Sequence, residues 1–111
     1  MKIMKLQDLE GHDVYEFSYL RNYNKDLCEN HWNKDSIYVS DEDFSKISKY
    51  IENFINSFDY YGVNKVSLYE WEHIKNKAKK DSKCLNEFFE AIDQWIKSDI
   101  DKSNSFWILG I

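Results

Sequence analysis

The chain has 111 residues, the size of one ordinary domain, and 42% of them are apolar, which is enough for one buried core. Its 20 acidic residues outnumber its 15 Lys and Arg residues, and the formal charge of −5 opposes binding to a nucleic-acid backbone. No stretch approaches the roughly 20 apolar residues that a membrane-spanning helix needs. We therefore expect a single domain over residues 1–111 that binds neither nucleic acid nor membrane.

The cysteines and the N-terminal residues indicate a compartment. Cys28 and Cys84 are the only two cysteines and are far apart in the sequence. Two such thiols, without the long apolar run of a secretory signal, are typical of reduced cysteines in a reducing compartment. We expect a cytoplasmic protein.

The first half of the chain predicts two strands and one helix. Residues 14–20 mix Val, Tyr and Phe, and residues 36–39 are short and β-prone, so each favours a strand. Ser40 followed by Asp43 resembles the capping box that starts a helix. Apolar residues then recur at three- and four-residue steps and predict a helix over about residues 41–57. These apolar residues are Phe44, Ile47, Ile51, Phe54, Ile55 and Phe58.

The second half predicts a turn, two more helices and a strand. Residues 59–64 (DYYGVN) are typical of a turn, and Gly62 permits a positive φ there. Ser67 and Glu70 form a second capping-box pattern, which predicts a helix over about residues 68–80. Ser82 begins a third helix that ends near Ser98, and the apolar residues 106–111 favour a buried strand. The predicted fold class is α+β, with about three amphipathic helices packed on a small β-sheet.

A search for catalytic and metal-binding patterns finds none that is complete. Cys28 and His31 lie three residues apart, but no second pair at metal-ligand spacing accompanies them. Glu70 and His73 form an E-x-x-H pattern, which in di-iron bundles requires a second such pair. The sequence contains no G-x-S-x-G motif and no glycine-rich phosphate loop. We therefore predict no catalytic, cofactor-binding or metal-binding residue.

Acidic residues cluster in three places, and such clusters usually mark a solvated face. One includes Asp8, Glu10, Asp13 and Glu16, and another includes Glu87, Glu90 and Asp93. The middle cluster, Asp35, Asp41, Glu42 and Asp43, differs because it adjoins the aromatic segment 36–39. The 59–61 turn also combines charge with aromatic rings. Tyrosine beside carboxylates suits a basic protein partner. We expect a binding surface formed or flanked by Asp35, Tyr38, Asp41, Glu42, Asp59, Tyr60 and Tyr61.

Three segments resemble a known group of proteins: WNKDSIYVSDEDF (residues 32–44), FDYYGVN (residues 58–64) and FWILGI (residues 106–111). Together they are similar to small bacterial immunity proteins of polymorphic toxin systems, including contact-dependent growth inhibition systems. The resemblance extends from about residue 15 to residue 111. It implies a protein that binds a cognate toxin domain, often a nuclease, and blocks its active site or substrate groove. It also implies no enzymatic activity and no cofactor, and it assigns no individual contact because these vary between pairs.

Two other functions remain open from the sequence alone. The first is a small metal- or cysteine-dependent hydrolase that uses Cys28, His31, His73 and nearby carboxylates. The second is a self-associating adaptor domain whose many aromatic rings lie at a homodimer interface. The oligomeric state is not predicted.

Overall fold

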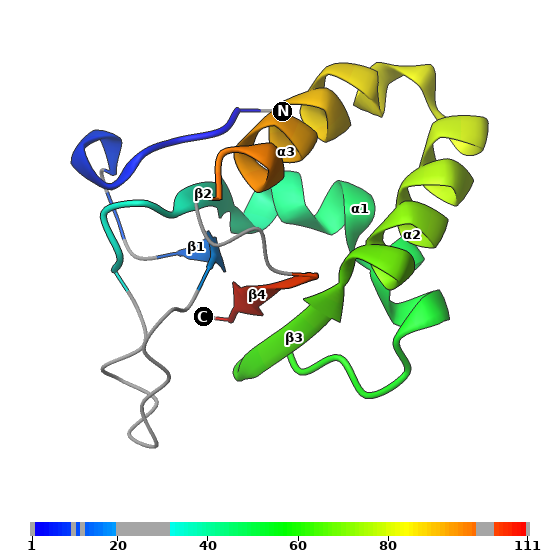
Figure 1. Ribbon diagram of the computed structural model, residues 1–111, viewed down its shortest axis with the longest axis horizontal. Coiled ribbons are helices and arrows are strands. Elements are labelled where there is room, and N and C mark those ends of the chain that lie inside the picture. The colour runs from blue at the N-terminus through cyan, green and yellow to red at the C-terminus, as the bar shows by residue number, and fades with distance from the viewer. Residues whose placement is uncertain (1, 10, 12, 20–31, 100–103, 111) are drawn as a thin grey trace.

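The computed structural model describes residues 2–9, 11, 13–19, 32–99 and 104–110. Four antiparallel strands form one sheet in the order β2-β1-β4-β3. Three helices pack over one face of this sheet, as Figure 1 shows. In chain order the elements are β1 (Val14–Ser18), β2 (Ile37–Ser40), α1 (Asp41–Phe54), β3 (Val63–Ser67), α2 (Leu68–Asp81), α3 (Asn86–Lys97) and β4 (Ser105–Leu109). The predicted α+β fold with three helices on a small sheet is confirmed.

Local capping explains where the first two helices begin. The Ser40 hydroxyl accepts the Asp43 N–H at 3.1 Å and starts α1. The Asp43 carboxylate does not return to Ser40, and instead accepts the Lys2 N–H at 3.0 Å. Ser67 and Glu70 form a complete capping box at the start of α2, which confirms the second predicted box.

The other boundaries differ modestly from the predicted ones. The third helix was expected to start at Ser82, but that side chain caps nothing, and a short 3-10 turn (Lys83–Leu85) precedes α3. Helix α1 ends at Phe54 rather than near residue 57, because Ile55 leaves the helical region with φ −114° and ψ 89°. Ile55 still packs against the core from the following loop, so the apolar spacing continues beyond the helix itself.

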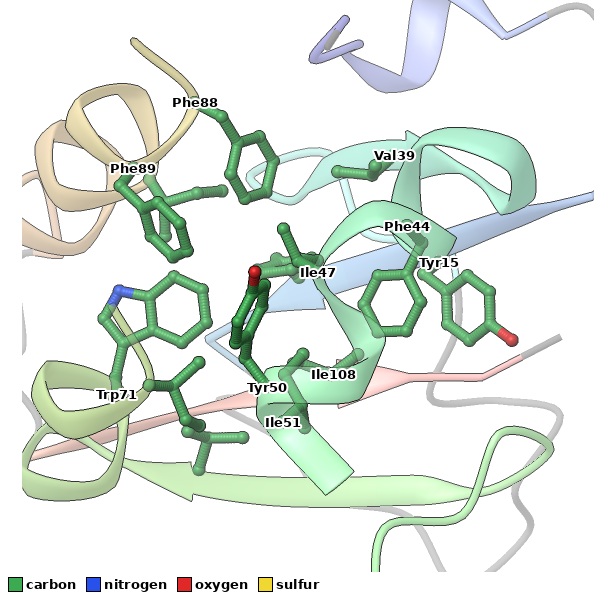
Figure 2. Close-up of a cluster of buried hydrophobic side chains, with 14 of the residues drawn as sticks. Tyr15, Val39, Phe44, Ile47, Tyr50, Ile51, Trp71, Phe88, Phe89 and Ile108 are labelled. Atoms are coloured by element: carbon green, nitrogen blue, oxygen red, sulfur yellow. The ribbon is translucent and has the colours of Figure 1, made fainter. Parts of the chain in front are cut away.

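Aromatic rings fill the space between the sheet and the helices. The Phe17 ring, on β1, is surrounded by four other rings whose centroids lie 5.9–6.5 Å from its own. These rings belong to Phe44, Trp71, Phe88 and Phe106. Figure 2 shows several of these rings in the layer between the helices and the strands. Burial of such large side chains supplies much of the stability of a small domain. Most aromatic residues described in the structure therefore have a core role.

Strand β3 was not predicted, and its first two residues, Val63 and Asn64, fall within the predicted 59–64 turn. None of the described helices combines the length and the apolarity needed to cross a membrane.

Candidate functional site

Two segments that are distant in the sequence meet at one end of the sheet. Asp41 and Glu42 begin α1 directly after β2, and residues 59–61 form the turn that leads into β3. Tyr15 lies between them, because its ring is 6.2 Å from the Tyr60 ring and its hydroxyl lies in the field of the Asp41 carboxylate. The structure thus brings together five of the seven residues predicted for the binding surface. We call this set the acidic end surface: Asp41, Glu42, Asp59, Tyr60 and Tyr61.

Among the described residues, the carboxylates of the acidic end surface have no cationic partner. No ion pair involves Asp41, Glu42 or Asp59 in the part of the chain that the structure describes. The acidic cluster on α3 differs, because Lys75 lies 3.0 Å from Asp93. The negative field at the end of the sheet is therefore less compensated than the field along α3.

Two tyrosine hydroxyls at this end stay protonated at neutral pH. Burial raises the pKa of Tyr15 to about 12, and the neighbouring Asp41 carboxylate adds to the shift. Burial also raises the pKa of Tyr60, and Glu52 contributes in the same direction. Both hydroxyls remain neutral donors beside the carboxylates, so they add no charge to this surface.

The turn that carries Tyr60 and Tyr61 is fixed by its own hydrogen bonds. The buried Asn64 side chain accepts the Asp59 N–H at 2.8 Å and donates to the Asp59 carbonyl at 2.8 Å. The Asp59 carboxylate accepts the Tyr61 N–H at 2.9 Å, so this residue has a structural role as well as a charge. The result is a rigid turn on which the Tyr61 side chain is 80% exposed.

A close approach of the C-terminal strand holds the same turn in place. The Gly110 N–H donates to the Gly62 carbonyl at 2.7 Å. A Cβ atom on Gly110 would lie 2.1 Å from the Tyr60 carbonyl oxygen, so only glycine fits there without a shift of the backbone.

Two predicted residues lie apart from the acidic end surface. Tyr38 is 0% exposed, and its hydroxyl donates to the Asn33 carbonyl at 2.8 Å, so its ring is buried on the sheet face opposite the helices. Asp35 precedes β2, at the other end of that strand from Asp41, roughly 20 Å away for an extended chain. Its carbonyl accepts the Trp95 Nε1–H at 2.9 Å, and it lines a cavity of about 640 Å³ beside α3. Neither residue belongs to the acidic end surface.

Glu16 was expected on a solvated acidic face, and this expectation is wrong. The side chain is 1% exposed, and its carboxylate accepts the Trp32 N–H at 2.6 Å, the Asn33 N–H at 3.0 Å and the Ser36 hydroxyl at 2.6 Å. The Asn33 amide group donates a further bond at 2.7 Å. These bonds hold Trp32 at a φ of 68°, in the left-handed region that non-glycine residues seldom adopt. Glu16 therefore organises the segment that covers the outer face of β1 and β2.

The residues considered for catalysis have structural roles where the structure describes them. The Glu70 carboxylate accepts the Ser67 N–H at 2.9 Å as part of the helix cap. The His73 ring stacks on Phe54 with centroids 5.1 Å apart and meets Tyr69 edge-on at 4.6 Å. Cys28 and His31, like His12 and Glu10, lie outside the described residues.

No cluster of three or more His, Cys, Asp or Glu side chains arranged to hold a metal ion occurs within the described ranges. The Cys84 thiol is exposed and is not in a disulfide.

The chain was compared with protein-family models, curated proteins and solved structures. No family model, no curated protein and no solved structure matches this chain.

Proposed function

We propose that this protein is an immunity protein that binds and neutralises a cognate toxin domain with a basic active-site groove, as nucleases have. The acidic end surface carries the proposal, because its carboxylates form no ion pair with any described residue and lie beside an 80% exposed tyrosine on a rigid turn. The resemblance of residues 32–44, 58–64 and 106–111 to toxin-immunity proteins supports the choice of a toxin as the partner. The protein would act in the cytoplasm, without a cofactor.

The proposed mechanism is occlusion of the substrate groove. Asp41, Glu42 and Asp59 would occupy positions in the groove that otherwise bind phosphate, and Tyr61 would supply the central apolar contact. The net charge of −5 would speed the encounter with a basic groove, and added salt would slow it. Because Asn64 and Gly110 already fix the turn, little conformational entropy would be lost when the complex forms.

The test is co-expression with the protein encoded directly upstream of this chain's gene. We expect that protein to be toxic alone, and we expect this chain to relieve the toxicity and to co-purify with it. The decisive variant is the double charge reversal Asp41→Lys with Glu42→Lys. A matched control, Glu87→Lys with Glu90→Lys, changes the total charge equally on the exposed face of α3.

Only the first double variant should lose protection, with affinity reduced at least about a hundredfold, as for truncated interfacial charge pairs. Asp59 is unsuited to this test because its carboxylate also holds the Tyr61 N–H. Equal loss in both double variants would show that net charge alone matters, and full protection by both would place the interface elsewhere.

A further inference from the structure

The two edge strands of the sheet, β2 and β3, differ in whether another segment pairs with them. At the β2 edge, Met4 and Tyr38 exchange two backbone hydrogen bonds of 2.9 Å, so the N-terminal segment covers that strand. At the opposite edge, no strand beyond β3 is present in the described ranges. An uncovered edge exposes backbone groups that can pair with another strand.

The register of β3 shows which backbone groups face outward. The Leu68 N–H donates to the Asn104 carbonyl at 2.8 Å, and the Gly110 N–H donates to the Gly62 carbonyl at 2.7 Å. Every second residue from Gly62 to Leu68 therefore directs its backbone N–H and C=O groups toward β4, which includes Asn64 and Val66. The intervening residues Val63, Lys65 and Ser67 therefore direct their backbone groups away from the sheet.

Glu70 already occupies one outward group, because its carboxylate accepts the Ser67 N–H at 2.9 Å. The N–H and C=O groups of Val63 and Lys65 have no hydrogen-bond partner among the residues the structure describes. Each of these two residues can exchange a pair of hydrogen bonds with one residue of an added strand. The open part of the edge is therefore short and well defined.

One exposed tyrosine lies at each end of the open edge of β3. Tyr61 is 80% exposed just before β3, and Tyr69 is 70% exposed just after it, in the first turn of α2. They are the two most exposed large hydrophobic side chains among the described residues. Tyrosine offers a broad contact at low entropic cost, so the pair suits the two ends of a bound extended segment.

We propose that β3 binds an extended strand of the toxin, which pairs with Val63 and Lys65 and contacts Tyr61 and Tyr69. This inference rests on the proposed function and is continuous with the acidic end surface through Tyr61. The partner is a different protein rather than a second copy, because two chains of charge −5 repel each other and a basic partner is attracted. Backbone pairing supplies affinity that does not depend on the sequence of the added strand.

Amide hydrogen exchange followed by NMR tests the pairing directly in the unmodified protein. In the free protein, the Asn64 and Val66 amides should exchange slowly and those of Val63 and Lys65 rapidly. In the complex with the upstream-encoded protein, exchange at Val63 and Lys65 should slow at least about tenfold. Unchanged exchange at both residues in a formed complex would overturn the inference and leave the proposed function intact.

A pair of substitutions at one position provides a second test. Lys65→Pro removes an outward N–H without loss of a bond to β4, whereas Lys65→Thr removes the charge and keeps the N–H. We expect Lys65→Pro to weaken toxin binding at least about tenfold and Lys65→Thr to change it less than about threefold.

Equal binding by both variants, with both folded, would refute the strand pairing. Absence of any complex with the wild-type chain would instead refute the proposed function, and this inference with it. A homodimer that protects Val63 and Lys65 without the partner would refute the choice of the toxin as the occupant.

Discussion

The Asn64 side chain provides the sharpest test of how the acidic end surface is built. It accepts the Asp59 N–H at 2.8 Å, and it donates to the carbonyls of Asp59 at 2.8 Å and Ile108 at 3.1 Å. These bonds join the turn to β4 through a residue that is only 9% exposed. Asn64→Ala removes all of them and should release the turn that displays Tyr61.

The expected cost follows from those bonds. A net contribution of about 1 kcal/mol for each, with water able to reach part of the turn, gives a loss of about 2–3 kcal/mol in the free energy of unfolding. For a domain of this size the midpoint of thermal unfolding should fall by about 10 °C. Stabilities of small domains are about 5–15 kcal/mol, so the variant should remain folded at 25 °C.

Urea denaturation followed by tryptophan fluorescence measures this loss, and titration calorimetry with the toxin measures binding. Asn56→Ala is the control, because Asn56 is exposed in the same loop and forms no side-chain hydrogen bond in the described structure. We expect Asn56→Ala to change stability by less than about 0.5 kcal/mol. A loss below about 1 kcal/mol for Asn64→Ala, with binding unchanged, would refute the account of the turn.

Three further substitutions test other parts of the structure. Glu16→Gln should lower the free energy of unfolding by about 2–4 kcal/mol in urea denaturation, because an amide cannot accept every bond that the buried carboxylate accepts; a loss under about 1 kcal/mol would contradict this. Gly110→Ala should lower the free energy of unfolding by about 2 kcal/mol, because the added Cβ would lie 2.1 Å from the Tyr60 carbonyl oxygen. Gly11→Ala is the control and should leave stability unchanged, because no described atom lies within 4 Å of an added Cβ there. Equal thermal midpoints for the two variants would disprove the close approach. A backbone hydrogen bond and Lys46 lower the pKa of Asp43 from 3.8, so its stabilisation is present at neutral pH and is lost as the pH falls through the lowered value. The stability difference between wild type and Asp43→Asn should therefore be larger at pH 7 than at pH 3, and a constant difference would be inconsistent with the shift.

The helices could be predicted because their signals are local. The cap at Ser67, and the apolar spacing from Phe44 to Ile51, lie within the segments that they specify. Strand β3 was missed because its pattern is mixed: Asn64 faces inward and Lys65 outward, so polar residues fall on both faces. Its pairing with β4 joins residues that are far apart in the sequence, and no short window contains that information.

The candidate site could be predicted only in part, for a related reason. Local composition at a helix start and at a turn was enough to predict that Asp41, Glu42 and Tyr61 lie at the surface. The burial of Tyr38 could not be predicted in this way, because it depends on the Trp32 ring. That ring stacks on the Tyr38 ring with centroids 6.0 Å apart and covers the second face of β2. The position of Glu16 in the middle of an apolar strand was the available signal for a buried carboxylate, since charged residues are seldom fully buried without partners.

Asn64 connects the two proposals physically. Its backbone faces β4, so it fixes which residues of β3 face outward, and its side chain fixes the turn that displays Tyr61. A shift of one residue in β3 would exchange the inward and outward backbone groups and would also detach the turn from its partner. The position of the acidic end surface and the identity of the open backbone groups therefore depend on the same register. A partner that contacts both would recognise only the correctly folded domain, because neither feature survives a change in the pairing of β3 with β4.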